Sequence, residues 1–158
     1  ININKIIQDK FKYNIFTITH TKMYLTALNI FFDNIFFGTG TKTYRKVCDD
    51  ELYSFYDGCL NHPHNTYIQL LSETGIVGSL PVISLFLFLI YIFCKIIFFK
   101  LFKNKSLYPD NYIYLLSALM ISLFPFVPTG SFFNNWLSII YYLPMGFLLY
   151  FHKNIKSK

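Results

Sequence analysis

The chain has 158 residues, of which 54% are hydrophobic and 21% aromatic, while 14% are charged. Soluble domains carry roughly 25% charged residues, so this composition excludes an ordinary soluble domain and is typical of a membrane protein. The formal net charge is +6. Because the basic residues responsible for it flank apolar segments and form no soluble patch, nucleic acid is not an expected partner.

The first element in chain order is a predicted amphipathic helix over about residues 20–36. Polar and apolar residues recur there at spacings of three and four, which is the period of a helix with two unlike faces. Such a helix fits the outer membrane–water interface, and the glycines at 38 and 40 are expected to end it. The polar stripe consists of Lys22, Thr26, Asn29 and Asp33, and the apolar one of Tyr24, Ala27, Leu28, Phe31 and Ile35.

Residues 41–61 are expected to form an irregular loop that carries charge and two cysteines. Cys48 and Cys59 flank a short segment, so in an oxidising compartment they could pair, and the alternative is two free thiols. The third cysteine, Cys94, lies in an apolar segment and is interpreted as a small packing residue.

Histidine, amide and carboxyl groups are concentrated between residues 62 and 78. A helix is predicted to begin at about Asn65, because proline at 63 precedes it and an asparagine side chain can cap the first turn. Asn65, Gln69 and Glu73 are spaced four apart and therefore share one face of that helix.

Three apolar segments follow, at 79–99, 112–131 and 133–151, each about long enough to cross a hydrocarbon core of ~30 Å. Residues 1–78 contain equal numbers of basic and acidic side chains, whereas residues 79–158 contain seven lysines and a single acid, Asp110. The positive-inside rule then places the loop 100–111 and the tail 152–158 in the cytoplasm, and residues 1–78 outside.

The predicted fold is therefore an all-α integral membrane protein, with a periplasmic loop that carries an amphipathic helix and is followed by three transmembrane helices. Prolines at 125 and 128 are expected to break the second span at its outer end. Because the chain starts at Ile1 without a secretory signal, we expect it to be the C-terminal part of a longer polytopic protein.

The two histidines, His62 and His64, have three interpretations. A His-x-His pair occurs in zinc sites, but no cluster of further ligands is evident in the sequence. The second interpretation is structural. The third is general-base catalysis, because an imidazole titrates near neutral pH and can take a proton from a hydroxyl group.

Cations that could accompany such a base lie between residues 38 and 46. Two glycines precede Lys42, Arg45 and Lys46, and exposed glycine backbone with these side chains could hold a phosphate. The segment lacks the Walker pattern and the strand context of dinucleotide-binding loops, so the pattern alone is weak.

The run His64-Asn65, nine residues and then Gly75-Ile76-Val77-Gly78 resembles the signature of the O-antigen ligase and polymerase superfamily. The earlier Tyr24-x-x-Ala27 and Phe37-Gly38-x-Gly40 are similar to the start of that family's large periplasmic loop. The resemblance covers about residues 20–80, and the later spans agree with the family in number and character.

The resemblance implies a metal-independent glycosyltransferase in the bacterial inner membrane, with its active face in the periplasm and no cofactor. Its donor would be a glycan on undecaprenyl diphosphate, and its acceptor a sugar hydroxyl of lipid A core or of a growing polysaccharide, in contact with membrane lipid. His64 would be the catalytic base and Arg45 the diphosphate-binding cation. His20 occupies a position where the family often has arginine, which shifts that contact to Lys22. The other expected substrate-binding residues are Lys42, His62, Asn65, Gln69 and Glu73.

Three other classes of protein stay open at this point, one enzymatic and two non-enzymatic. A protein O-oligosaccharyltransferase would use the same donor with a different acceptor. A polysaccharide or ion transporter would line its path with the histidines, although the apolar segments hold few ionisable residues. A purely structural membrane subunit is the third alternative.

Overall fold

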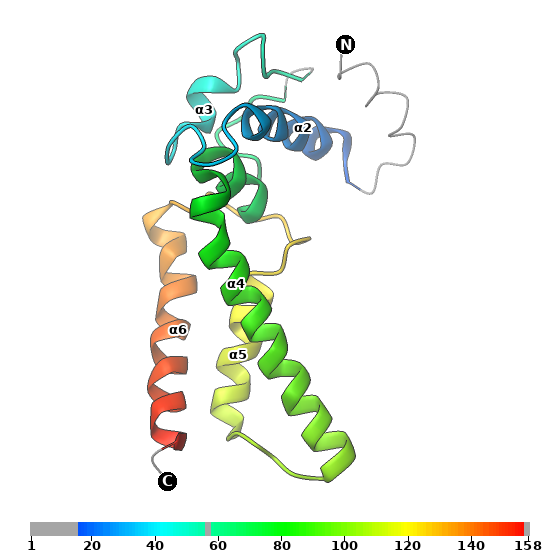
Figure 1. Ribbon diagram of the computed structural model, residues 1–158, viewed down its shortest axis with the longest axis vertical. Coiled ribbons are helices and arrows are strands. Elements are labelled where there is room, and N and C mark those ends of the chain that lie inside the picture. Colours follow the sequence, from blue (N-terminus) through cyan, green and yellow to red (C-terminus); the bar gives the residue numbers. More distant parts are fainter. Residues whose placement is uncertain (1–15, 56–57, 157–158) are drawn as a thin grey trace. The chain divides into compact units, whose positions relative to one another are not determined.

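A computed structural model describes residues 16–55 and 58–156 of the chain. All regular secondary structure in these ranges is helical, which confirms the predicted all-α class (Figure 1). The weakly patterned residues 1–15 and the last two residues of the predicted tail lie outside the described ranges. The helices are α2 (Ile18–Asp33), α3 (Tyr44–Val47), α4 (Thr66–Lys103), α5 (Asp110–Ser122) and α6 (Asn135–Lys156).

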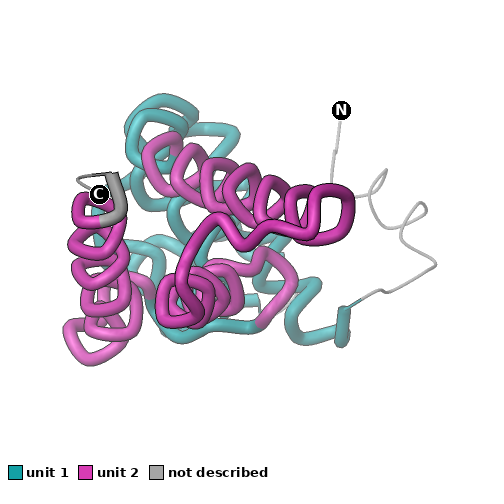
Figure 2. Tube along the Cα trace, turned by 90° about the horizontal axis from the view of Figure 1, so that it is seen from below, with its two compact units in different colours: residues 1–79, 128–131 teal, residues 80–127, 132–158 magenta. Residues whose placement is uncertain are grey.

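The chain forms two compact units, coloured separately in Figure 2. Unit 1 comprises residues 1–79 together with the short segment 128–131, and unit 2 comprises residues 80–127 and 132–158. The segment 128–131 precedes α6 in sequence but contacts the loop region.

Helix α2 belongs to unit 1, and two residues of its polar stripe contact the loop at residues 53–55. The Thr17 side chain caps its first turn by accepting the backbone N–H of His20. Thr26 is fully buried, and its hydroxyl oxygen accepts the backbone N–H of Phe55 at 3.0 Å. Asn29 donates to the Tyr53 carbonyl at 3.1 Å. The periodicity correctly predicted a helix here. It placed Thr26 and Asn29 on a polar face, whereas in the structure both side chains form hydrogen bonds with the loop.

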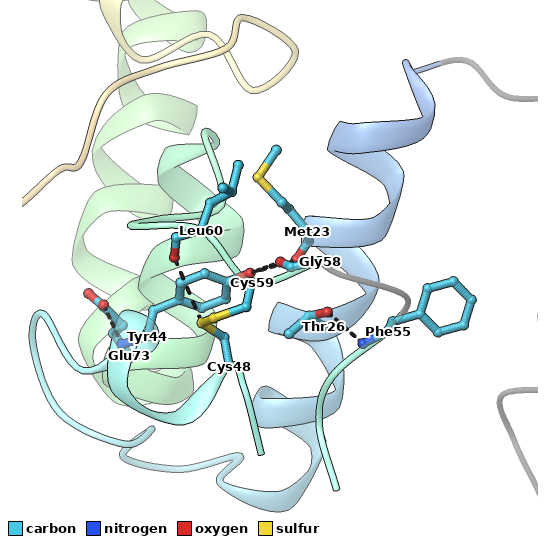
Figure 3. Close-up of a disulfide and its surroundings, with 9 residues drawn as sticks. All are labelled: Met23, Thr26, Tyr44, Cys48, Phe55, Gly58, Cys59, Leu60 and Glu73. Atoms are coloured by element: carbon cyan, nitrogen blue, oxygen red, sulfur yellow. Dashed lines mark hydrogen bonds between the residues drawn. A yellow bond between two sulfur atoms is a disulfide. The ribbon is translucent and has the colours of Figure 1, made fainter. Parts of the chain in front are cut away.

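Tyr44 of α3 contacts both α2 and the loop at Gly58. Its side chain is fully buried, and its hydroxyl donates to the Gly58 carbonyl at 2.9 Å and lies 3.3 Å from that of Met23 (Figure 3). Burial raises the pKa of Tyr44 well above its ordinary value. The surrounding core contains Ala27, Ile30 and Cys48, with Val47, Tyr53, Cys59 and Ile68 packed against it.

Cys48 and Cys59 form a disulfide in this core, with their Cα atoms 5.0 Å apart (Figure 3). The bond closes a loop between residues separated by 11 positions. Cross-linking a loop of this size restricts the unfolded chain and stabilises the fold by ~2–3 kcal/mol. The bridge therefore fastens the segment after α3 to the segment that leads into the histidines.

We expect a Cys48→Ser/Cys59→Ser variant to unfold at a clearly lower temperature than the wild type, because the unfolded chain regains its entropy. Thermal unfolding of the purified full-length protein, with and without a reducing agent, measures this. Cys94→Ser is the matched control, since Cys94 is a free, exposed cysteine in unit 2. An unchanged Tm in the double variant would contradict the stabilising role.

Helix α4 consists of two helices joined at Gly75. Asn65 caps the first, because its side-chain oxygen accepts the backbone N–H groups of Tyr67 at 3.0 Å and Ile68 at 3.1 Å. Gly75 has φ 62° and ψ −166°, a conformation that is essentially restricted to glycine. The second helix begins at Ile76, whose N–H donates to the Ile35 carbonyl at 2.8 Å.

Of the described helices, α4 alone is long and apolar enough to cross a membrane, judged by length and composition. Most of its large apolar side chains beyond Ser79 are exposed or half-buried, as expected where lipid is the solvent. Helix α5 has 13 residues, about 20 Å at 1.5 Å per residue, which is less than the predicted span 112–131. It ends at Ser122, before the prolines that were expected to break it. Helix α6 has 22 residues and covers the third predicted span from residue 135 to residue 151.

Helices α5 and α6 pack side by side within unit 2 (Figure 1). The Tyr112 hydroxyl of α5 lies 3.3 Å from Nδ1 of His152 on α6. Tyr108 stacks on the Tyr112 ring with a centroid separation of 4.4 Å. Aromatic contacts therefore join the start of α5 to the end of α6.

Candidate active site

Three histidines from two distant segments meet in unit 1. The rings of His62 and His64 have their centroids 4.1 Å apart, and the His20 ring lies edge-on to His64 at 5.9 Å. His20 sits in the first turn of α2, where its Nδ1 lies 2.7 Å from the Thr17 hydroxyl. The cluster thus places one more imidazole beside His64 than the His-x-His pattern predicted.

The backbone of His64 is left-handed, with φ 53°, which is uncommon for a residue other than glycine. Its carbonyl accepts the backbone N–H of Thr129 at 2.9 Å. The Thr129 hydroxyl also lies 3.0 Å from that of Thr66, the first residue of α4. The segment 128–131 therefore fixes the turn that presents the His64 ring. Among the described residues, none forms a hydrogen bond with that half-buried ring.

His62 occupies the least solvated place in the cluster. Burial lowers its pKa below the ordinary 6.5, and the neighbouring His64 lowers it further, while a hydrogen bond with the Thr129 backbone opposes both effects. Its Nε2 atom is buried without a hydrogen-bond partner in the structure. A neutral imidazole is the form that suits this position.

The stability of the protein is expected to fall as the pH drops below about 6.5, in part because of His62. Its native pKa is depressed, so in that range the unfolded chain binds more protons than the native one, and protonation favours unfolding. Tm measured between pH 7.5 and 5 should therefore decrease for the wild type. A His62→Gln variant should show a smaller decrease, and an equally steep one in both proteins would contradict this role of His62.

The amide and carboxyl residues of the first part of α4 are buried. Asn65, Gln69 and Glu73 have exposed fractions of 6%, 2% and 1%. Asn65 also forms a hydrogen bond with Tyr24, which partly opposes the rise in Tyr24 pKa caused by burial. Gln69 Nε2 lies 3.1 Å from Glu73 Oε2 and 2.9 Å from the Ser131 hydroxyl. The shared face was predicted correctly, but it faces the protein interior.

The cations after the glycines are exposed: Lys42, Arg45 and Lys46 extend from the turn and from α3. The backbone beneath them is already engaged. The N–H groups of Lys42 and Tyr44 donate to the Glu73 carboxylate, and that of Gly40 donates to the Glu73 carbonyl at 2.8 Å. The glycine N–H groups, which were expected to help hold a phosphate, also have partners in the protein: Gly38 donates to the Asn34 carbonyl at 2.9 Å, as Gly40 does to that of Glu73. Anion binding here depends on the side chains.

The predicted site residues thus form two groups in unit 1. One is the histidine cluster, which consists of His20, His62 and His64. The other is the cation segment, residues 38–46, whose backbone forms hydrogen bonds with the buried Glu73; Gln69 in turn contacts Glu73. In the part of the chain that the structure describes, no hydrogen bond or ring contact joins the side chains of Lys42 or Arg45 to the histidines. Lys22 lies half-buried on α2 without such a contact to either group.

Sequence reasoning missed the contributions of Thr129 and Ser131 and the proximity of His20 to His64. No local signal pointed to the first two, since they are small polar residues some 60 positions away from their partners. For metal ions, the described residues with ligand atoms close together are Cys48, Asp49 and Cys59. The disulfide occupies both of those sulfur atoms.

A comparison with known protein families matches residues 18–83 to the family described as O-Antigen ligase. This stretch of the chain is similar to that family. The match includes α2, the cation segment, the disulfide, the histidines at 20, 62 and 64, and the Gly75 break. It confirms the resemblance found in the residues. No curated protein and no solved structure matches the chain.

The matched family is one of membrane-associated, glycosyltransferase-like enzymes whose substrates are polysaccharides or lipid-linked glycans. The matched stretch ends just inside the apolar part of α4, the helix that can cross a membrane. The candidate site therefore lies in the segments before α4 and in the first part of that helix.

Proposed function

We propose that the protein transfers a glycan from undecaprenyl diphosphate to a sugar hydroxyl, of lipid A core or of a growing polysaccharide, at the periplasmic face of the bacterial inner membrane. The observation that carries the proposal is that one stretch similar to O-antigen ligases contains both a half-buried imidazole and exposed cations. Charge placement supports the periplasmic face, because lysines flank the opposite ends of the apolar segments.

His64 acts as the general base in this proposal. The acceptor hydroxyl attacks the anomeric carbon of the donor sugar and transfers its proton to a ring nitrogen of His64. The bond between that carbon and the diphosphate oxygen breaks, and undecaprenyl diphosphate leaves. General-base assistance of this kind contributes about 10²–10⁴-fold to a rate.

Arg45 and Lys42 stabilise the charge that develops on the leaving diphosphate. Both side chains are exposed, and both extend from a backbone held by buried hydrogen bonds. Donors positioned before the reaction stabilise a developing anion without further reorganisation. An arginine can contact two phosphate oxygens at once, whereas a lysine supplies a point charge. Neither step requires a metal ion.

Purified full-length protein tests this function when it is incubated with an undecaprenyl-diphosphate-linked glycan and a lipid A core acceptor. We expect a ligated or elongated glycan together with free undecaprenyl diphosphate, and the same yield in EDTA. Transfer to a protein acceptor alone would identify a protein O-oligosaccharyltransferase. Glycan flux in liposomes without any donor-dependent product would contradict the proposal and favour a transporter.

A further inference from the structure

Glu73 is an almost fully buried carboxylate whose partners are backbone groups of the cation segment. Its Oε2 atom accepts the N–H of Lys42 at 3.1 Å, and its Oε1 atom accepts the N–H of Tyr44 at 2.9 Å. Figure 3 shows Glu73 directed at the backbone of Tyr44. The carboxylate thus takes the position that an anionic ligand would take in a loop of converging N–H groups.

Main-chain hydrogen bonds also attach the cation segment to this part of α4. The carbonyls of Ser72 and Glu73 accept the N–H groups of Thr39 at 3.2 Å and Gly40 at 2.8 Å. Lys42 has a left-handed backbone with φ 60°, which an ordinary residue adopts only when its surroundings impose it. The two hydrogen bonds to Glu73 on either side of Thr43 supply that constraint.

Gln69 holds the carboxylate in place from the preceding turn of α4. Its amide nitrogen contacts both Glu73 and Ser131, so the buried network extends to the segment 128–131. Buried polar networks of this kind specify one geometry when every member has a partner. Loss of the carboxylate would leave backbone N–H groups in the interior without acceptors, and the cation segment would move to satisfy them.

We propose that Glu73 is a positioning residue, which sets the direction from which Lys42 and Arg45 reach the donor's diphosphate without touching any substrate itself. This inference rests on the proposed function and assigns Glu73 a role other than the substrate contact expected from sequence. Because Glu73 acts through the two cations, its effect on donor binding must disappear when they are absent.

A double-mutant cycle tests this dependence. The measured quantity is the Kd of the full-length protein for undecaprenyl diphosphate. Glu73→Gln keeps the size of the side chain but presents an amide N–H₂ to one of the two backbone donors. We expect it to raise the Kd about tenfold in the wild-type background, the effect of losing roughly one charge-assisted hydrogen bond. In a Lys42→Ala/Arg45→Ala background we expect less than about a twofold change.

Ser72→Ala is the matched control on the same helix, because it keeps the carbonyl that accepts the Thr39 N–H and removes a hydroxyl that bonds within α4. Its Kd should equal that of the wild type. An equal effect of Glu73→Gln in both backgrounds, or no effect in either, would overturn the positioning role. If the wild type fails to bind undecaprenyl diphosphate, the proposed function and the positioning role built on it both fail. If the wild type binds undecaprenyl diphosphate but transfers no glycan, the proposed reaction fails and the positioning role of Glu73 can still be judged from the Kd values.

Discussion

A His64→Ala variant of the full-length protein is expected to lose at least about 100-fold in the rate of glycan transfer, because no other group would take the acceptor's proton. Its ring is half-buried and, among the described residues, makes no hydrogen bond. The neighbouring His62 cannot replace it readily, since Nε2 of His62 is buried and its pKa is depressed by burial. Cells that carry this variant should lack the surface polysaccharide that depends on the transfer.

The matched control for this experiment is His152→Ala. His152 lies on α6 in unit 2, where its ring contacts Tyr112 and takes no part in the histidine cluster. It should retain transfer at close to the wild-type rate. Surface glycan of normal length and attachment in the His64→Ala strain would show that His64 is not the base.

Gly75→Ala is expected to prevent normal folding of unit 1. A Cβ atom at this position would collide with the backbone of Phe36, and the φ and ψ of Gly75 are closed to alanine. Backbone strain of this kind costs ~1–3 kcal/mol before the collision is counted, so the total should exceed ~3 kcal/mol. The collision would also separate Phe36 from Val77, whose N–H donates to the Phe36 carbonyl at 3.1 Å.

Thermal unfolding of purified protein measures this effect, with Gly146→Ala as the control. A Cβ atom at Gly146 on α6 would meet no atom within 4 Å, so this substitution should leave Tm unchanged or raise it slightly, as alanine favours a helix by ~1 kcal/mol over glycine. A Gly75→Ala protein that unfolds at the wild-type temperature would refute the account of the break in α4.

The local features of the candidate site were predictable because their causes are local. Asn65 was expected to cap a helix and does, since asparagine at that place accepts the N–H groups that a first turn leaves free. The family signature now has a structural explanation: Asn65 begins the first part of α4, and Gly75 allows the second part to start in a new direction.

The long-range features had no local cause and were missed. The four-residue spacing correctly placed Gln69 and Glu73 on one face, but it carried no information on whether water or the cation segment covers that face. The same limit applied to Thr26, which was assigned to a polar stripe and is buried against the loop. Contacts of Thr129 and His20 with the histidine turn depend on the tertiary fold, which periodicity does not encode.

In the membrane segments, too, the presence of helices was predictable from the sequence, but their limits were not. Composition predicted apolar helices, and α4 has the length and apolarity of a membrane span. The limits of the second segment were less predictable, because the turns after Ser122 depend on two prolines and on the attachment of residues 128–131 to unit 1. Hydropathy averages over such turns and therefore extended the helix past its end.

The central claim is that His64 performs chemistry while Lys42 and Arg45 bind the donor's diphosphate. The most direct measurement is the Kd for undecaprenyl diphosphate of the wild type, His64→Ala and Lys42→Ala/Arg45→Ala full-length proteins. We predict that His64→Ala binds within about twofold of the wild type, and that the cation variant binds at least about tenfold more weakly. Wild-type affinity in the cation variant, or loss of binding in His64→Ala, would contradict this division of roles.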